Sequence, residues 1–426
     1  MTIAPIPTEN ARLGTSFFAP QARLVGEDGT PILIGEQPVS ADISSVTVTQ
    51  VNTGVSQVEV VLNNQHHTND RHRILAPSWR YNKLDTLGFG KRVRVDMRYG
   101  SDGWTPMVLA RITDVGFVFP SAEGAKITLK GEDLLSLLKT KPDENKRHDE
   151  VQEVDLVTSL LAESRCGLTS AGEATSPFTE PLATITHEKA KTYLQFIQSL
   201  AERMDFEVFV EFDNVEPGSP GRNPTQADVR TVGFHFAPSR SANLGTPVTL
   251  LYGRDIVDFK PTFKVWDILT GAVADGAVPR GRGRLETEPV AMADAINDLH
   301  AAEGGPTPIN AADVREAAFA NENRPAENVE TINVQNIDVE RAQLQATAKL
   351  RTSARQLLTA DVTTIGFPKL RPGMHVDIKE MYAPFDGIWY VTKTVHALSA
   401  SGYTTKSSLR RPGMLDASTY PLGGET

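Results

Sequence analysis

The sequence has little cysteine, few aromatic residues and no long apolar run. Cys166 is the single cysteine among 426 residues, so neither an internal disulfide nor a cysteine-based metal cluster can form within one chain. No apolar run approaches the roughly 20 residues that a membrane-spanning helix needs, and the first residues lack the basic and apolar parts of a signal peptide. We therefore expect a protein that folds in the cytoplasm, without export or membrane insertion.

Positive charge is not in excess. The chain has 43 basic and 53 acidic residues, for a net charge of −10. Such a chain repels phosphate instead of releasing its counterions, so we expect no stable nucleic acid binding. The length, with 40% hydrophobic residues, is enough for two to four domains, each with its own core.

The clearest pattern is a β meander near the end of the chain, within residues 362–411. Its three alternating apolar runs are Val376–Ile378, Ile388–Val395 and Thr404–Leu409. Turn signals at Pro372-Gly373, Asp386-Gly387 and Ser401-Gly402 separate them. Short alternating runs between such turns are typical of antiparallel strands.

A similar layout occurs once earlier in the chain. When Gly90 is aligned with Gly373, Val93 and Val95 fall opposite Val376 and Ile378. The same alignment places Asp102-Gly103 near Asp386-Gly387, Val108–Phe119 near Trp389–Ala397, and Lys126–Leu129 near Lys406–Leu409. An internal repeat predicts two copies of one domain; the alternative is chance likeness between two hairpin-rich segments.

The strand Lys91–Tyr99 has two chemically distinct faces. One face carries Val93, Val95, Met97 and Tyr99, and the other carries Arg92, Arg94, Asp96 and Arg98. Successive strand residues point to opposite sides of a sheet. We expect the first face to meet a core and the second to meet water or a charged partner.

Helical periodicity appears between the two β segments. A short helix is expected from Leu134, and a stronger one over Ala190–Met204, with Thr186 as its cap. The alternating strand Phe206–Phe212 follows, so this region predicts a small α/β insertion. A further helix is expected over Val339–Leu358.

Residues 275–329 are rich in Ala, Gly, Pro and Glu. This composition predicts a segment that is mobile or ordered by a partner, with one short helix around Ala291–Ala302.

No pattern indicates a metal or anion site. The loop histidines His66, His67 and His72 have no acidic or thiol partner at a fixed spacing, so a solvated loop is favoured over zinc. The arginines of 280–284, spaced by glycines, also favour a solvated loop. Gly88–Lys91 leads into a strand and lacks the phosphate-loop pattern. We expect no cofactor.

Catalytic patterns are also missing. No Gly-x-Ser-x-Gly is present, and His396 lies in a strand, where a structural role is favoured. The pair Glu132-Asp133 lies at an expected helix start, where carboxylates favour the helix dipole. The sequence therefore predicts no enzyme.

The order G-x-P-x-L-x-P-G, F-x-G-x-W-Y-V, V-H, G-Y-T-T and L-R-R resembles the phage late-control D family. The segment L-K-G-E-D-L-L at 129–135 is similar too. These are baseplate hub proteins of contractile phage tails and contractile injection systems, related to the hub portion of type VI secretion spike proteins. The positions expected to shape the modules are Gly366, Pro368, Pro372, Gly373, Phe385, Gly387, Tyr390, His396, Gly402 and Tyr403.

The resemblance implies a mainly β fold with an α/β insertion: two tandem tube-like β-barrel domains, a small α/β domain and connecting helices. The expected division is an N-terminal arm at 1–14, the first barrel at 15–144, the α/β insertion domain at 145–237, strands of the second barrel at 238–274, a mobile insertion at 275–335, a helix and the remainder of the second barrel at 336–411, and a tail at 412–426.

The resemblance also implies a structural baseplate hub. The hub would be a homotrimer with pseudo-sixfold symmetry that joins a hexameric inner tube ring to a trimeric spike. Since little sequence follows Arg411, we expect the spike to be a separate protein. The trimer would assemble in the cytoplasm and contact surrounding baseplate proteins in a phage tail or tail-like particle.

The alternative is a tail-associated component that degrades the cell wall or binds glycans. It predicts an aromatic-lined groove or a pair of carboxylates in a cleft. Aromatic residues make up only 7% of the chain, which favours the hub.

Overall fold

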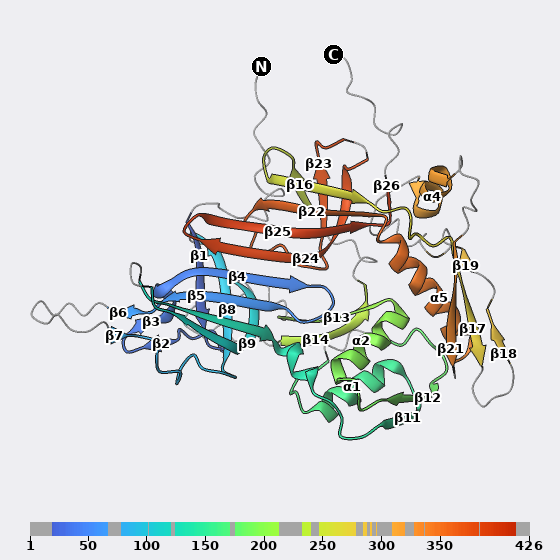
Figure 1. Cartoon of the computed structure of the whole chain (residues 1–426), viewed down its shortest axis with the longest axis horizontal. Coiled ribbons are helices and arrows are strands. Elements are labelled where there is room, and N and C mark those ends of the chain that lie inside the picture. Colours follow the sequence, from blue (N-terminus) through green and yellow to red (C-terminus); the bar gives the residue numbers. More distant parts are fainter. Residues whose placement is uncertain are drawn as a thin grey trace, which may run out of the picture.

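A computed structural model shows a mainly β protein (Figure 1). It describes residues 19–66, 78–100, 102–120, 124–170, 175–212, 232–239, 247–277, 284–287, 290–291, 295, 309–319, 328–335, 337–382 and 384–414. The expected arm at 1–14 and most of the tail at 412–426 lie outside them. Twelve strands, from residues 20–133 and 248–411, form one sheet.

The first β module contains six neighbouring strands of this sheet. In sheet order they are β1 (Pro20–Val25), β8 (Arg92–Tyr99), β9 (Thr105–Val118), β10 (Lys126–Asp133), β5 (Gln57–Asn63) and β4 (Ile43–Val51). One buried cluster takes side chains from all six strands, and the two end strands approach each other. The module therefore curls around its own core.

The second β module repeats this order. Its strands are β15 (Val248–Leu251), β23 (His375–Lys379), β24 (Gly387–Ser399), β25 (Gly402–Arg411), β22 (Leu358–Ile365) and β16 (Ile256–Phe263). They surround a second core that contains the fully buried Trp389. One difference is that β15 pairs with β23 in parallel, whereas β1 and β8 are antiparallel.

Backbone geometry confirms the alignment of Gly90 with Gly373. The Gly90 N–H donates to the Ile112 carbonyl at 2.8 Å, and the Gly373 N–H donates to the Val391 carbonyl at 2.8 Å. Their φ angles of 78° and 85° lie in the left-handed region that favours glycine.

The modules also share two β-bulges. The β9–β10 ladder shifts register at Thr113, and the β24–β25 ladder shifts at Thr392. The β4–β5 ladder shifts at Ser44, and the β16–β22 ladder shifts at Val257. Since bulges fix register, these pairs give a residue-by-residue correspondence between the modules.

This correspondence corrects one part of the sequence alignment. Lys130 and Ser408 occupy equivalent positions, because their partners directly follow the two bulges. The alignment of Lys126–Leu129 with Lys406–Leu409 is therefore two residues out of register. A shift of two keeps every side chain on its own face, so alternation alone could not reveal it.

The charged face of β8 is not simply a solvent face. Arg94 and Asp96 are both fully buried, and the Arg94 Nε donates to the Asp96 Oδ1 at 2.8 Å. Arg23 on the neighbouring strand adds a second ion pair to Asp96 at 2.6 Å. The expectation of water or a charged partner is wrong at these two positions, because the chain supplies the partners itself.

An α/β region comes between the two modules in the sequence and lies beside them in space (Figure 1). Its elements are β11 (Lys146–Val151), α1 (Glu153–Ser164), β12 (Leu182–His187), α2 (Tyr193–Met204), β13 (Phe206–Phe212) and β14 (Val232–Pro238). The 3-10 helix η2 (Leu134–Lys139) leads into it. One core unites the helices with β13 and β14.

Helix α2 starts later than expected. Thr192 caps it, and Gln195 donates its backbone N–H to the Thr192 side chain and accepts the Thr192 N–H in return. The predicted cap Thr186 instead pairs with Arg147 in the β11–β12 ladder. Apolar periodicity predicted the approximate position of the helix, whereas the capping box determines its first residue.

A smaller sheet packs beside the long helix α5 (Val339–Ala354). Its strands are β17 (Gly271–Ala277), β18 (Arg284–Glu286), β19 (Val290–Ala291) and β21 (Val329–Gln335). Nearby are β20 (Ile309–Asn310), α4 (Ala311–Phe319) and β26 (Gly413–Met414). The described parts of 275–335 thus form regular structure, and most of the helix expected at Ala291–Ala302 lies outside the described residues.

The remaining elements are short. They are β2 (Leu33–Ile34), β3 (Gln37–Pro38), the 3-10 helix η1 (Val39–Asp42), β6 (Gln65–His66) and β7 (Ser78–Trp79). A search of the described helices finds none that is long and apolar enough to span a membrane.

Candidate functional site: the seam between the two modules

The two modules join edge to edge within one chain. Strand β4 pairs antiparallel with the second half of β24, from Val46 opposite Leu398 to Val51 opposite Lys393. The Asn52 N–H extends the ladder by donating to the Thr392 carbonyl at 3.0 Å. The first half of β24 pairs with β23 instead. We call the β4–β24 contact the seam; in Figure 1 the two strands run side by side.

Side chains of the second module complete the core of the first. Tyr403 belongs to the buried cluster of the first module, and Leu398 packs against that cluster. The Tyr403 ring lies 5.6 Å from the ring of Tyr99. The seam therefore combines a backbone ladder with a shared apolar core.

His396 lies at the centre of the seam and is fully buried. Its Nε2 lies 3.0 Å from the Leu370 carbonyl, and its Nδ1 lies 2.8 Å from the Tyr403 hydroxyl. Since a carbonyl can only accept, Nε2 carries the proton and Nδ1 accepts from the hydroxyl. Burial lowers the pKa of His396 well below its usual value, and the nearby charge of Arg371 lowers it further. His396 is therefore neutral, as a structural role requires.

Acid is expected to destabilise the seam through His396. Because its pKa is lowered by folding, the unfolded chain takes up a proton below about pH 6.5 that the folded chain does not. The stability contribution is complete above this pH and falls by up to about 1.4 kcal/mol per pH unit below it. We expect His396→Gln to flatten this loss, measured as urea unfolding at pH 7.5 and 5.5.

The difference in pH dependence between the wild type and His396→Gln is due to His396 alone. Burial raises the pKa of Asp133 to about 7, and burial lowers the pKa of His187, but both groups are present in wild type and variant. An unchanged slope in His396→Gln would contradict the assignment.

Gly366 lies against the ring of Tyr403. A Cβ at this position would be 2.2 Å from the Cδ1 and Cγ atoms of Tyr403. The Gly366 N–H also donates to the Tyr403 carbonyl at 3.0 Å. A residue with any side chain would push the ring out of its place in the seam.

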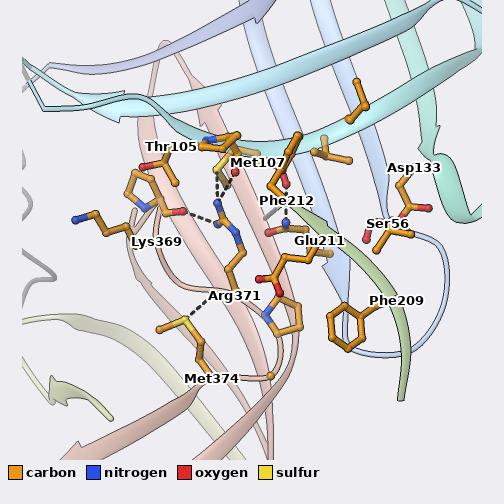
Figure 2. Close-up of a pocket in the computed structure, with 18 of the residues that line it drawn as sticks. Ser56, Thr105, Met107, Asp133, Phe209, Glu211, Phe212, Lys369, Arg371 and Met374 are labelled. Atoms are coloured by element: carbon orange, nitrogen blue, oxygen red, sulfur yellow. Dashed lines mark hydrogen bonds between the residues drawn. The ribbon is translucent and has the colours of Figure 1, made fainter. Parts of the chain in front are cut away.

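Arg371 ties the loop before β23 to the first module. Its Nη2 donates to the Pro106 carbonyl at 2.9 Å and lies 3.2 Å from the Met107 sulfur. Its Nη1 donates to the carbonyls of Pro368 and Leu370. Figure 2 shows the side chain reaching from the loop towards Met107. Arg371 could not be singled out from the sequence, because nothing in L-R-P-G distinguishes a buried arginine from a solvated one.

A buried carboxylate connects the α/β region to both modules. Glu207 accepts from the Tyr390 hydroxyl at 2.8 and 2.7 Å and from the Asn52 amide at 2.6 Å. Arg410 lies 3.4 Å from it. The only sequence signal was a glutamate within the otherwise apolar start of β13. The Tyr390 hydroxyl is thus held by a residue of the α/β region.

The remaining predicted motif residues support turns and aromatic contacts. Phe385 lies 6.2 Å from Phe259 and 5.9 Å from Phe263, as ring centroids. Gly387 and Gly402 have φ angles of 112° and 119°, which suit the turns before β24 and β25. The motif set of Gly366, Pro368, Pro372, Gly373, Phe385, Gly387, Tyr390, His396, Gly402 and Tyr403 thus divides between the seam and the second module.

A cavity of about 770 Å³ runs along the end of the seam. Figure 2 shows Phe209, Phe212 and Glu211 of β13 on one side and Arg371 on another. Asp133 also lines it, but this carboxylate accepts N–H groups from Ser56 at 2.7 Å and Leu135 at 3.0 Å. Asp133 therefore caps η2, as its place at the helix start predicted.

In the described part of the chain, no group of three or more His, Cys, Asp or Glu side chains is placed to hold a metal ion. Of the loop histidines, His66 belongs to β6, while His67 and His72 lie outside the described residues.

Comparisons by sequence and by structure give different results. No protein-family model matches the sequence, and no curated protein matches it. By structure, the chain is similar to the tail protein from Neisseria meningitidis MC58, with a TM-score of 0.58 and 12% identity over 95% of this chain and 100% of that one. It is also similar to the 43 kDa tail protein of prophage MuSo2 from Shewanella oneidensis, with a TM-score of 0.57 and 12% identity over 92% and 99% of the two chains.

These similarities establish the fold. Nearly the whole of both tail proteins superimposes on nearly the whole of this chain. The fold implied by the resemblance to baseplate hub proteins, mainly β with two tandem modules and an α/β insertion, is confirmed.

Proposed function

We propose that this protein, which has the fold of phage-type tail proteins, is a structural hub of a contractile tail or tail-like injection machine. Three copies would form a ring with pseudo-sixfold symmetry, joining a hexameric tube to a threefold spike. Its role would be mechanical, without catalysis or cofactor. The surrounding baseplate proteins would contact its outer surface.

The repeat is the observation that carries this proposal. Both modules have the same strand order, the same two bulges and the same glycine turn. A hexameric ring presents six equivalent faces, whereas a trimeric spike presents three. A chain with two equivalent modules can match both, since three copies then supply six units.

We expect the purified protein to be a trimer. Light scattering coupled to size exclusion should give three times the chain mass at micromolar concentration. Negative-stain class averages should show a ring of six similar lobes with threefold symmetry. A protein that remains monomeric and does not bind its tube or spike proteins would refute the proposal.

The cavity at the end of the seam supports a second candidate, a glycan-binding or wall-degrading role. Its lining combines aromatic residues such as Trp104 and Phe209 with the carboxylates of Glu207 and Glu211. However, Glu207 is occupied by Tyr390 and Asn52, which favours a structural use. Turnover or retention of purified peptidoglycan would favour the second candidate.

A further inference from the structure

Among the open strand edges of the described sheet, the repeat relates two to the seam. On one edge, β9 pairs with β8 as far as Arg111, and Ile112 still bonds Gly90 and Lys91. Beyond Ile112, no described strand pairs with this edge of β9. Strand β16 pairs only with β22 among the described strands. The edge of β9 is equivalent to that of β24 in the second module, and the edge of β16 is equivalent to that of β4 in the first. These two equivalent edges pair with each other in the seam.

We propose that β16 of one copy pairs with the second half of β9 in the next copy, repeating the seam between chains. This inference rests on the proposed trimer and adds the strands and the register that hold it. The occupant of each open edge is then a second copy of this chain. Every copy supplies one edge of each kind, so a closed ring leaves neither edge open.

The matched bulges predict the register. Thr113 corresponds to Thr392 and Ser44 to Val257. Transferring the six pairs of the seam through this correspondence gives six pairs between chains. They are Asp114 with Lys264, Val115 with Phe263, Gly116 with Thr262, Phe117 with Pro261, Val118 with Lys260, and Phe119 with Phe259.

Several of the predicted pairs are complementary in chemistry. Asp114 meets Lys264, which is a pair of opposite charges. The equivalent pair in the seam, Lys393 opposite Val51, has no such charge pairing. Val115 meets Phe263, which is apolar on both sides. Opposite charges and aromatic or β-branched pairs both stabilise facing strands, whereas like charges destabilise them.

Large apolar side chains are exposed along both open edges. On β9 and just beyond it, Val118 is 55% exposed and Phe119 is 51% exposed. On β16, Phe263 is 40% exposed and Val257 is 67% exposed. Exposed apolar side chains gathered on an unpaired edge indicate a surface that another chain covers.

The internal seam shows how this apolar surface would be buried. Leu398 packs against the core of the first module, and its equivalent is Phe119. Phe259, opposite Phe119 in the predicted register, already packs against the second core. Phe119 would therefore close the open side of the second core in the neighbouring copy.

Pro261 also fits a strand whose outer edge is used in this way. Asn52 and the alternate residues before it direct their N–H groups towards β24, as the Asn52 bond to Thr392 shows. Pro261 is equivalent to Val48 of this series, so an N–H at this position would point to the outer edge. Proline therefore removes no hydrogen bond from the pairing with β22. The new ladder would lose one hydrogen bond and keep those from Phe259 and Phe263.

Engineered cysteines test the register. Val118 and Lys260 would face each other on the side of the sheet away from the core, within disulfide reach. We expect Val118→Cys/Lys260→Cys to form a covalent trimer under mild oxidation, seen on a non-reducing gel. In the control, Val118→Cys/Lys264→Cys, the cysteines are four residues out of register and about 13 Å apart, so the cross-linked yield should be at least tenfold lower.

The outcomes separate this inference from the proposed function. A trimer by light scattering that does not cross-link at 118 and 260, or that cross-links equally in the control, overturns the strand pairing and leaves the hub proposal standing. A monomer by light scattering overturns the strand pairing, and a monomer that also does not bind its tube or spike proteins overturns both. Buried Cys166 remains in all variants, and the wild type should give no covalent trimer.

Charge reversal provides a second, independent test. Asp114→Lys should raise the concentration at which the trimer half-dissociates by at least tenfold, because it faces Lys264 with a like charge. Asp114→Lys/Lys264→Asp should restore trimerisation, since each β9–β16 contact between chains regains a pair of opposite charges. Failure of the double variant to recover, with the single variant impaired, would overturn the predicted pairing.

Discussion

Replacing Arg341 with methionine is expected to lower the free energy of unfolding by about 3–5 kcal/mol. Arg341 of α5 is 2% exposed, and its Nε and Nη2 bond both oxygens of Glu153, at 2.7 and 3.0 Å. Its guanidinium also lies 4.2 Å from the ring of Phe178. Removal would leave the buried Glu153 carboxylate without its cation. Urea unfolding followed by circular dichroism measures the loss.

Two further variants make this expectation specific. Glu153→Met/Arg341→Met should be less destabilised than the sum of the two single variants, since it leaves neither charge of the buried pair unpaired. The control is Lys349→Met on the same helix, whose ion pair with Glu330 is exposed; it should cost less than about 1 kcal/mol. A double variant that loses as much as the sum would show that the two residues act independently.

This ion pair explains how the α/β region is attached to the second module. Glu153 lies on α1, whereas Arg341 lies at the start of α5, which leads into β22. A second contact joins Asp205, just after α2, to Arg351 and Arg355 near the end of α5. The α/β region thus holds the helix near both of its ends.

The repeat could be predicted from the sequence because its signals are local. Gly90 and Gly373 mark the same left-handed turn, and alternation places Val93 and Val376 on equivalent strands. The capping of η2 by Asp133 was local too. These features depend on neighbours within a few residues, which a single sequence displays.

The seam could not be predicted in this way. Thr394 and Gln50, which lie opposite each other, are 344 residues apart. Edge pairing uses backbone groups that every residue has, so it leaves little trace in residue type. Arg371 and Glu207 were missed for a related reason, because their partners become neighbours only after the two modules join.

The two open edges are of the same two kinds as the edges that pair in the seam. Each module has one edge like that of β4 and one like that of β24. Within a chain only one edge of each kind is used, and the other pair remains available. Two modules joined by one seam keep one edge of each kind open, which is the basis of the proposed pairing between chains.

Gly366→Ala is expected to destabilise the protein by about 3 kcal/mol or more, with loss of the shared core at the seam. The added Cβ would be 2.2 Å from the Tyr403 ring, and this ring cannot easily move. Its hydroxyl is bonded to His396 at 2.8 Å, and its ring lies 5.6 Å from the ring of Tyr99. Thermal and urea unfolding measure the effect.

A matched control separates the collision from the general cost of losing a glycine. Gly103→Ala lies in a turn where an added Cβ meets no atom within 4 Å, so its effect should stay within about 0.5 kcal/mol. Combining Gly366→Ala with Tyr403→Ala removes the ring that the Cβ would meet. If the collision is the cause, the double variant should be no less stable than Tyr403→Ala alone. Equal losses from Gly366→Ala with and without the ring would place the cause in the backbone instead.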